Sequence, residues 1–189
     1  MNRAEKNEQT KYRLAEAVKE CMKHSPAEEI TVKEIVSQCG VTRQTFYRHF
    51  RDRSDLINWY FDRLLEESFR EMGSGDTVYD GLVRKFEYIR KEQVFFRAAF
   101  SSDEQNNLKE HDFQRIVAFY KDLILRKTGM PADNEITELL EMYCSASIWK
   151  TVDWVIRGME KSERELASVM VNAMPAKLEA LFEKLNLLK

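Results

Sequence analysis

The chain has 189 residues, of which 43% are hydrophobic and 33% charged, so it can bury a core without help from metals or disulfides. Its three cysteines lie far apart and belong to no C-x-x-C or Cys/His cluster with the spacing of a metal site. Six glycines and three prolines are too few for a turn-rich β protein, and helix-forming residues dominate. The composition therefore predicts an all-α fold with no metal and no cofactor.

Several function classes have no support in the sequence. The first thirty residues are charged throughout and lack the apolar segment of a signal peptide, and no later segment is apolar and long enough to span a membrane. There is no G-x-S-x-G, no glycine-rich loop before a helix and no H-E-x-x-H. We therefore expect a cytoplasmic protein that neither contacts membranes nor acts as an enzyme.

The net charge of −2 gives no sign of nucleic-acid binding, but the distribution of charge is uneven. Residues 1–53 hold eleven Lys or Arg against eight Asp or Glu, or +3, whereas residues 54–189 hold nineteen against twenty-four, or −5. Positive charge is densest at residues 42–53, where four arginines face one aspartate. Taken alone, this cluster suits an ordinary solvated helix end as well as a nucleic-acid interface.

Two short helices joined by a glycine turn are predicted after an amphipathic helix at residues 10–22. Thr31 and Glu34 have the spacing of a capping box, which begins a helix over residues 32–38. Gly40 can adopt the left-handed conformation that ends this helix. Thr42 then provides the N-cap of a helix that ends near residue 50.

The rest of the chain shows further helical periodicity. A fourth helix, capped by Asp52, is apolar on more than one side and is expected to be buried on two faces. Gly73-Ser74-Gly75 is the clearest break. Pro175 should kink the last helix, because it removes a donor and clashes with the preceding turn. The helices from the fourth onward are expected near residues 52–72, 77–91, 93–101, 111–128, 133–158 and 162–184.

The two short helices and their glycine turn are the elements of a helix-turn-helix, whose second helix enters the major groove of DNA. Arg and Gln can pair with guanine and adenine edges, Thr can touch a thymine methyl, and Tyr and His suit phosphate oxygens. A helical hairpin with an exposed polar face is the alternative. The side chains expected on the DNA side are Arg43, Gln44, Thr45, Tyr47, Arg48 and His49.

These residues also carry a resemblance. ITVKEIV at residues 30–36, CGVTRQTFYRHF at residues 39–50 and the following Asp55-Leu56 resemble the N-terminal signature of the TetR/AcrR family of regulators. The resemblance implies that Thr31 anchors a phosphate together with the start of the second helix, and that residues 42–45, from Thr42, face base edges. It also implies backbone contacts from Tyr47 and His49.

Three positions depart from the family pattern. The family usually has small residues where Val36 and Cys39 stand, and a lysine where Arg53 begins the fourth helix. These replacements keep the packing or the charge, and Arg53 is expected to hold a phosphate. The predicted domains are a helix-turn-helix DNA-binding domain at residues 1–53 and a helical regulatory and dimerisation domain at residues 54–189.

The C-terminal part resembles the family less specifically. Residues 149–158 and the following Ser162-Glu163-Arg164-Glu165-Leu166 are similar to regulators of the dihydroxyacetone kinase type. The resemblance implies that the last two long helices form a four-helix bundle with those of a second subunit. Apolar residues wrap most of the helix at residues 133–158, which agrees with a homodimer formed through residues 133–184.

Regulators of this family usually hold an inducer between the C-terminal helices. Aromatic side chains could line such a pocket, although core packing is the simpler explanation for each of them, because an aromatic at helical spacing needs no ligand. We therefore expect a repressor that a small-molecule inducer releases from a pseudo-palindromic operator in double-stranded DNA. The alternative is a DNA-binding activator or adaptor that responds to a protein partner and has no small-molecule pocket. The candidate pocket residues are Phe86, Phe95, Phe96, Phe100, Phe113, Tyr120 and Tyr143.

Overall fold

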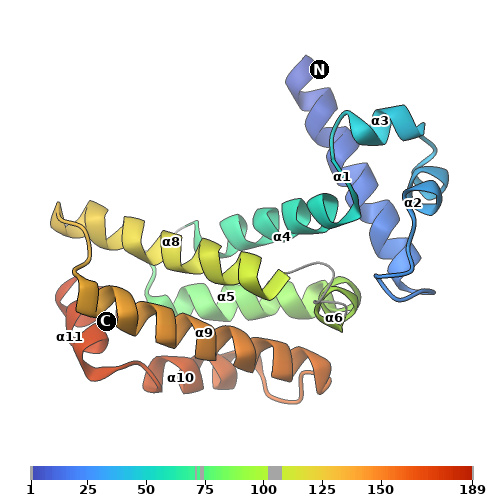
Figure 1. The fold of residues 1–189 in the computed structure, drawn as a ribbon. Helices are drawn as coiled ribbons and strands as arrows, with labels where there is room; N and C mark the ends of the chain where they lie inside the picture. The colour runs from blue at the N-terminus through green and yellow to red at the C-terminus, as the bar shows by residue number, and fades with distance from the viewer. Residues whose placement is uncertain (1, 71, 73–74, 102–107, 189) are drawn as a thin grey trace. The chain divides into compact units, whose positions relative to one another are not determined.

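The computed structural model describes residues 2–70, 72, 75–101 and 108–188, and in these it contains helices and an isolated β-bridge between Met72 and Asp76 (Figure 1). The predicted all-α fold is confirmed. The chain divides into two compact units: unit 1 spans Met1–Leu64 and Glu92–Leu108, and unit 2 spans Leu65–Lys91 and Lys109–Lys189. Of the predicted break, Gly73 and Ser74 lie outside the described residues. The predicted boundary after Arg53 stays a prediction.

Unit 1 packs its helices around a small core. Each of its helices contributes residues with no exposed surface to this core. Because these residues recur at helical spacing, each helix turns one apolar face inward. The helices are α1 (Arg3–Met22), α2 (Val32–Cys39), α3 (Arg43–Tyr47), the first part of α4 (Arg53–Phe69), and α6 (Gln93–Ser101). The fully buried side chains include Leu14, Val18, Ile35, Phe46, Leu56 and Ile57.

The helix starts of unit 1 follow from local side-chain hydrogen bonds. α1 begins earlier than predicted, because Asn2 and Glu5 form a capping box that the sequence analysis did not use. At α4 the Asp55 amide donates to Asp52 Oδ1 at 2.8 Å, which confirms the predicted cap. α3 ends at Tyr47, whereas the sequence predicted an end near residue 50. The helical hydrogen-bond pattern nevertheless continues, because the Phe50 amide donates to the Phe46 carbonyl at 2.9 Å.

Among the described residues, unit 2 contains five helices besides the last turn of α4. Side-chain contacts show that α8 lies against α5, through Lys85 and Asp112, and against α11, through Tyr120 and Phe182. Tyr143 of α9 donates from its hydroxyl to a carbonyl of α10 at 3.0 Å. The helices are α5 (Val78–Lys91), α8 (Leu108–Thr128), α9 (Asn134–Ile156), α10 (Glu163–Asn172) and α11 (Ala176–Lys184).

Pro175 breaks the last predicted helix where only a kink was expected. α10 ends at Asn172, and α11 begins at Ala176 with Pro175 in the preceding cap position, at φ −58° and ψ 136°. Proline without an amide hydrogen suits this position, because the first amides of a helix have no acceptor within it. No helix of the described residues combines the length and the apolar character that crossing a membrane requires.

Candidate nucleic-acid interface

The turn between α2 and α3 is built by two capping arrangements. Gly40 ends α2 at φ +68°, and the Val41 amide closes the turn by donating to the Val36 carbonyl at 3.0 Å. Thr42 then begins α3, because its Oγ1 accepts from the Thr45 amide at 3.1 Å. The two hydroxyls of these threonines also lie 3.0 Å apart, within hydrogen-bond distance. The direction of α3 is therefore fixed by residues within one turn of its start.

Aromatic packing holds one face of α3. Phe46 has no exposed surface, and its ring lies 5.9 Å from that of Phe50, which in turn lies 5.6 Å from Trp59 on α4. Tyr12 of α1 meets the other edge of this cluster, 5.1 Å from Trp59. Ring pairs at these distances add to the apolar burial. α3 therefore cannot turn about its axis without breaking the core of unit 1.

The opposite face of α3 presents polar side chains to solvent. Arg43, Gln44 and Arg48 are exposed, and Tyr47 is 57% exposed even though its neighbour Phe46 is fully buried. Thr45 is half-buried beside the cap. An exposed Arg and Gln at the first two positions of a short helix match the base contacts of a recognition helix. The structure thus brings these predicted side chains together on one surface.

Thr31 serves first as a structural cap. Its hydroxyl donates to Glu34 Oε2 at 2.7 Å and accepts from the Glu34 amide at 3.2 Å, and its own amide donates to the same carboxylate at 2.7 Å. These bonds lower the pKa of Glu34. A phosphate at this end of α2 would have to use the first helical amides, which have no acceptor within the helix. The role of Thr31 toward DNA stays a prediction.

Arg53 also has a partner within the protein. Its Nη1 donates to the Glu28 carbonyl at 2.8 Å and to the Ile30 carbonyl at 2.7 Å. These bonds tie the first residue of α4 to the segment that precedes α2. A phosphate contact by Arg53 stays a prediction. In the unbound protein its guanidinium stabilises the fold by donating to these two carbonyls.

His49 is half-buried, and its Nε2 has no hydrogen-bond partner among the described residues. Burial lowers the pKa of His49, and the nearby charges of Arg48 and Lys11 lower it further. The unbound protein therefore favours the neutral imidazole. A phosphate oxygen would supply both a partner for Nε2 and a charge that opposes these effects.

One contact of this region was missed by the sequence analysis. Arg13 of α1 donates from Nη2 to the Cys39 carbonyl at the end of α2, at 2.9 Å. A cation at this position satisfies a carbonyl that has no partner within α2 and suits the negative end of the helix dipole. Arg13 does not stand out in the sequence, because α1 carries many charged residues on its outer face.

The predicted pocket aromatics are divided between the two units. Phe95, Phe96 and Phe100 belong to unit 1, where Phe96 lies 5.3 Å from Phe95 and 5.7 Å from Phe100. All three are buried, which is what core packing requires. Their role as ligand contacts stays a prediction.

The other candidates, Phe86, Phe113, Tyr120 and Tyr143, belong to unit 2. Tyr120 and Tyr143 line a space of about 20 Å³, close to the size of one water molecule. Phe86 is fully buried against Trp154, at 5.5 Å between ring centroids. Ligand contacts by these four residues also stay a prediction.

Comparison with known families agrees with this geometry. Residues 14–59 match the family model of bacterial regulatory proteins of the tetR family, and residues 76–175 match the model of a transcriptional regulator C-terminal region. The fold and the exposed recognition helix define a DNA-binding transcriptional regulator of the helix-turn-helix class. The chain belongs to the TetR family, as the resemblance in the sequence predicted.

Individual relatives support the family assignment and the similarity to regulators of the dihydroxyacetone kinase type. The chain is 27% identical over 179 residues to the HTH-type dhaKLM operon transcriptional activator DhaS of Lactococcus lactis subsp. lactis (strain IL1403), covering 90% of each chain. It is 24% identical over 119 residues to the HTH-type transcriptional regulator SAR2658 of Staphylococcus aureus (strain MRSA252), covering 61% of this chain and 63% of the relative. The solved structure of the dihydroxyacetone kinase operon activator DhaS shares the fold at a TM-score of 0.68 and 22% identity, covering 90% of this chain and 97% of that one.

Proposed function

We propose that this regulator binds a pseudo-palindromic operator as a homodimer and acts as a repressor that a small-molecule inducer releases. The observation that supports the DNA contact is the alternation on α3, where Phe46 is fully buried and the adjacent Tyr47 is 57% exposed. This alternation holds Arg43 and Gln44 outward on a helix that cannot rotate. Outward Arg and Gln side chains at the start of such a helix suit contacts with base edges.

The exposed side of α9 supports the homodimer. Met142, Trp149 and Ile156 are 70%, 66% and 40% exposed, and their spacing of seven residues places them on one face of the helix. Val169 of α10 is 44% exposed. Large apolar side chains exposed in a row mark an interaction surface. A second copy of α9 and its neighbours would cover them, and two recognition helices related by a dimer axis need two matching half-sites.

Selection from a pool of random duplexes tests this proposal with the full chain. We expect the retained duplexes to share an inverted repeat, and light scattering to give twice the mass of one chain. Scrambling one half of the selected site should abolish tight binding. Undiminished binding to a single half-site, or a stable monomer at micromolar concentration, would contradict the proposal.

A second candidate function is an activator that responds to a protein partner. The relative from Lactococcus lactis is named as an activator, and the space lined by Tyr120 and Tyr143 holds only about 20 Å³. Transcript levels beside the selected sites, measured with and without the gene for this chain, distinguish the two. A rise after deletion supports a repressor, and a fall supports an activator.

A further inference from the structure

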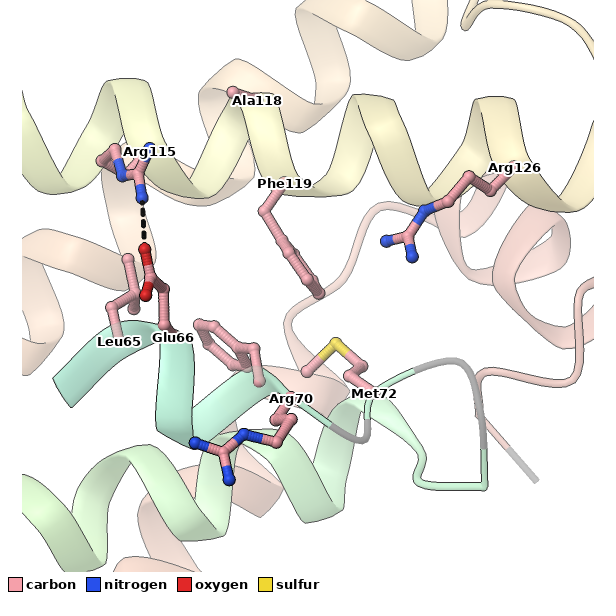
Figure 2. Close-up of a pocket in the computed structure, with 9 residues that line it drawn as sticks. Leu65, Glu66, Arg70, Met72, Arg115, Ala118, Phe119 and Arg126 are labelled. Atoms are coloured by element: carbon pink, nitrogen blue, oxygen red, sulfur yellow. Dashed lines mark hydrogen bonds and ion pairs between the residues drawn. The ribbon is translucent and has the colours of Figure 1, made fainter. Parts of the chain in front are cut away.

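Unit 2 contains a groove between the end of α4 and α8, which we call the α4–α8 groove. Its volume is about 330 Å³, within the range of small-molecule sites. Leu65, Phe69 and Met72 line it from α4 and the residues that follow, and Phe119 lines it from α8. Figure 2 shows Phe119 reaching from α8 toward Met72, so that the two sides of the groove approach each other at its floor.

The apolar floor of the groove is held by packing. The rings of Phe69 and Phe119 stack at 5.2 Å between centroids, with 23° between their planes. Behind them α5 comes close enough that a side chain at Gly81 would collide with Met72 and press against Phe69. The stacked pair of rings does not have to be ordered when a ligand binds, which favours affinity.

The rim of the groove is cationic. Three arginines line it, Arg70, Arg115 and Arg126, whereas Glu66 is the one carboxylate among the lining residues that the structure describes. Arg115 Nη2 lies 3.3 Å from Glu66 Oε1, an ion pair drawn in Figure 2. Glu66 offsets one of the three charges within the lining, whereas Arg70 pairs with Glu67 at 3.9 Å and Arg126 pairs with Asp122, two carboxylates that do not line the groove.

Arg126 is the arginine best placed to receive an anion. Its Nε pairs with Asp122 Oδ2 at 2.9 Å, one turn back on α8, and this is an exposed pair of the kind that contributes little to stability. Figure 2 shows its guanidinium turned toward the space beside Phe119 and Met72. The two terminal nitrogens of Arg126 can thus bind a carboxylate in parallel while Nε keeps its partner.

We infer that the α4–α8 groove binds an amphipathic organic anion, with an apolar body on the Phe69–Phe119 floor and a carboxylate at Arg126. This inference rests on the proposed effector-controlled function and assigns the chemical class of the effector. The helix that lines this groove, α4, begins at Arg53 in unit 1. Its part in unit 1 carries Trp59, whose ring packs against Phe50.

Three probes of equal chain length test the charge preference: octanoate, 1-octanol and octylamine, titrated into the full chain by calorimetry. We expect octanoate to bind about tenfold more tightly than octanol, the ratio that a hydrogen-bonded charged contact typically gives, and octylamine to bind more weakly than both. Arg126→Gln should reduce octanoate affinity about tenfold and leave octanol binding unchanged.

Lys127→Gln is the matched control, because it removes the same charge from the next residue, which does not line the groove. We expect octanoate to bind this variant as it binds the unmodified protein. Equal affinities for the three probes, no binding of octanoate, or equal losses in both variants would overturn the inference.

DNA binding is measured separately on the same protein samples. If the selected duplex binds and octanoate does not, the assigned ligand class is wrong while the regulatory function stands. If octanoate binds with the expected preference and no duplex is retained, the groove stands and the proposed function fails.

Discussion

The α2–α3 hairpin and α9 are both helical and rich in apolar residues, but their side chains are placed by different causes. In the hairpin, Thr31, Gly40 and Thr42 fix the ends of both helices through bonds that span three to five residues. In α9, Trp149 is 66% exposed and Trp154 only 4% exposed, five residues apart on the same helix. Local spacing decides which side of a hairpin helix is buried, whereas in α9 the neighbouring helices decide.

The two tryptophans of α9 differ in the contacts that neighbouring elements make with their side chains. Trp154 lies 5.5 Å from Phe86, has the Arg90 guanidinium 5.2 Å above its ring, and donates from Nε1 to the Lys161 carbonyl at 3.0 Å. The side chain of Trp149 makes no ring contact and no hydrogen bond among the described residues. A helix that is apolar on several sides therefore buries only the side chains that its neighbours reach, as α5 and the following loop reach Trp154.

The largest effect should come from the buried residue of the recognition helix. Phe46→Ala removes a fully buried ring from the core of unit 1, and we expect a loss of about 3–5 kcal/mol in the free energy of unfolding. Tyr47→Ala is the matched control, because it loses mainly one ring contact, worth at most about 1.5 kcal/mol. Denaturant unfolding checks both values. Similar losses in the two variants would mean that α3 is not fixed as described.

A large effect is also expected on the exposed face of α9. Trp149→Glu should weaken the dimer by about 2 kcal/mol or more, roughly thirtyfold in its dissociation constant, since a charge replaces a large aromatic at the subunit contact. Leu125→Glu, at a 45% exposed position of α8, should leave the dimer intact. Sedimentation equilibrium gives both constants. An unchanged dimer in Trp149→Glu would place the subunit contact elsewhere.

DNA affinity separates the two kinds of contact on α3. Arg43→Ala or Gln44→Ala should cost about 1–3 kcal/mol on the selected operator and much less on a scrambled duplex. Arg51→Ala removes another exposed cation, one that lies outside α3, so any loss should be alike on both duplexes. Titrations at several salt concentrations measure these losses. If Arg43→Ala lowers both affinities by the same factor, Arg43 does not contact bases.

The glycine turn tests how far local conformation fixes the hairpin. Gly40→Ala should destabilise unit 1 by about 1–2 kcal/mol, because φ is +68° there and the space around a Cβ is open, so that only the backbone is strained. Gly40→Asn should lose less, because asparagine tolerates the left-handed conformation. Thermal unfolding compares the two variants. Equal losses would show that the turn has some other requirement.

The smallest effect expected is the pH dependence at His49. Its pKa lies below the ordinary value of 6.5, so the unfolded chain binds a proton at a higher pH than the folded one does. Stability should therefore fall as the pH drops below about 6.5 and through the folded pKa. His49→Gln should remove this part of the pH dependence, as measured by unfolding near pH 7.5 and 5.5.

Operator binding at low pH gives the complementary result. If His49 holds a phosphate, the affinity lost in His49→Gln should grow as the pH falls, because the phosphate favours the protonated ring. A loss that stays constant with pH would show that a proton on His49 takes no part in the contact.

The sequence by itself determined the all-α fold and the candidate DNA contacts on α3, because the capping boxes, the glycine turn and the helical period act over a few residues. Only the tertiary structure decided that Pro175 separates two helices, that Trp154 is buried while Trp149 is exposed, and that Phe69 of α4 lines a groove together with Phe119 and Arg126 of α8. Such features depend on residues that are distant in the chain, and no local pattern encodes which helix faces will meet.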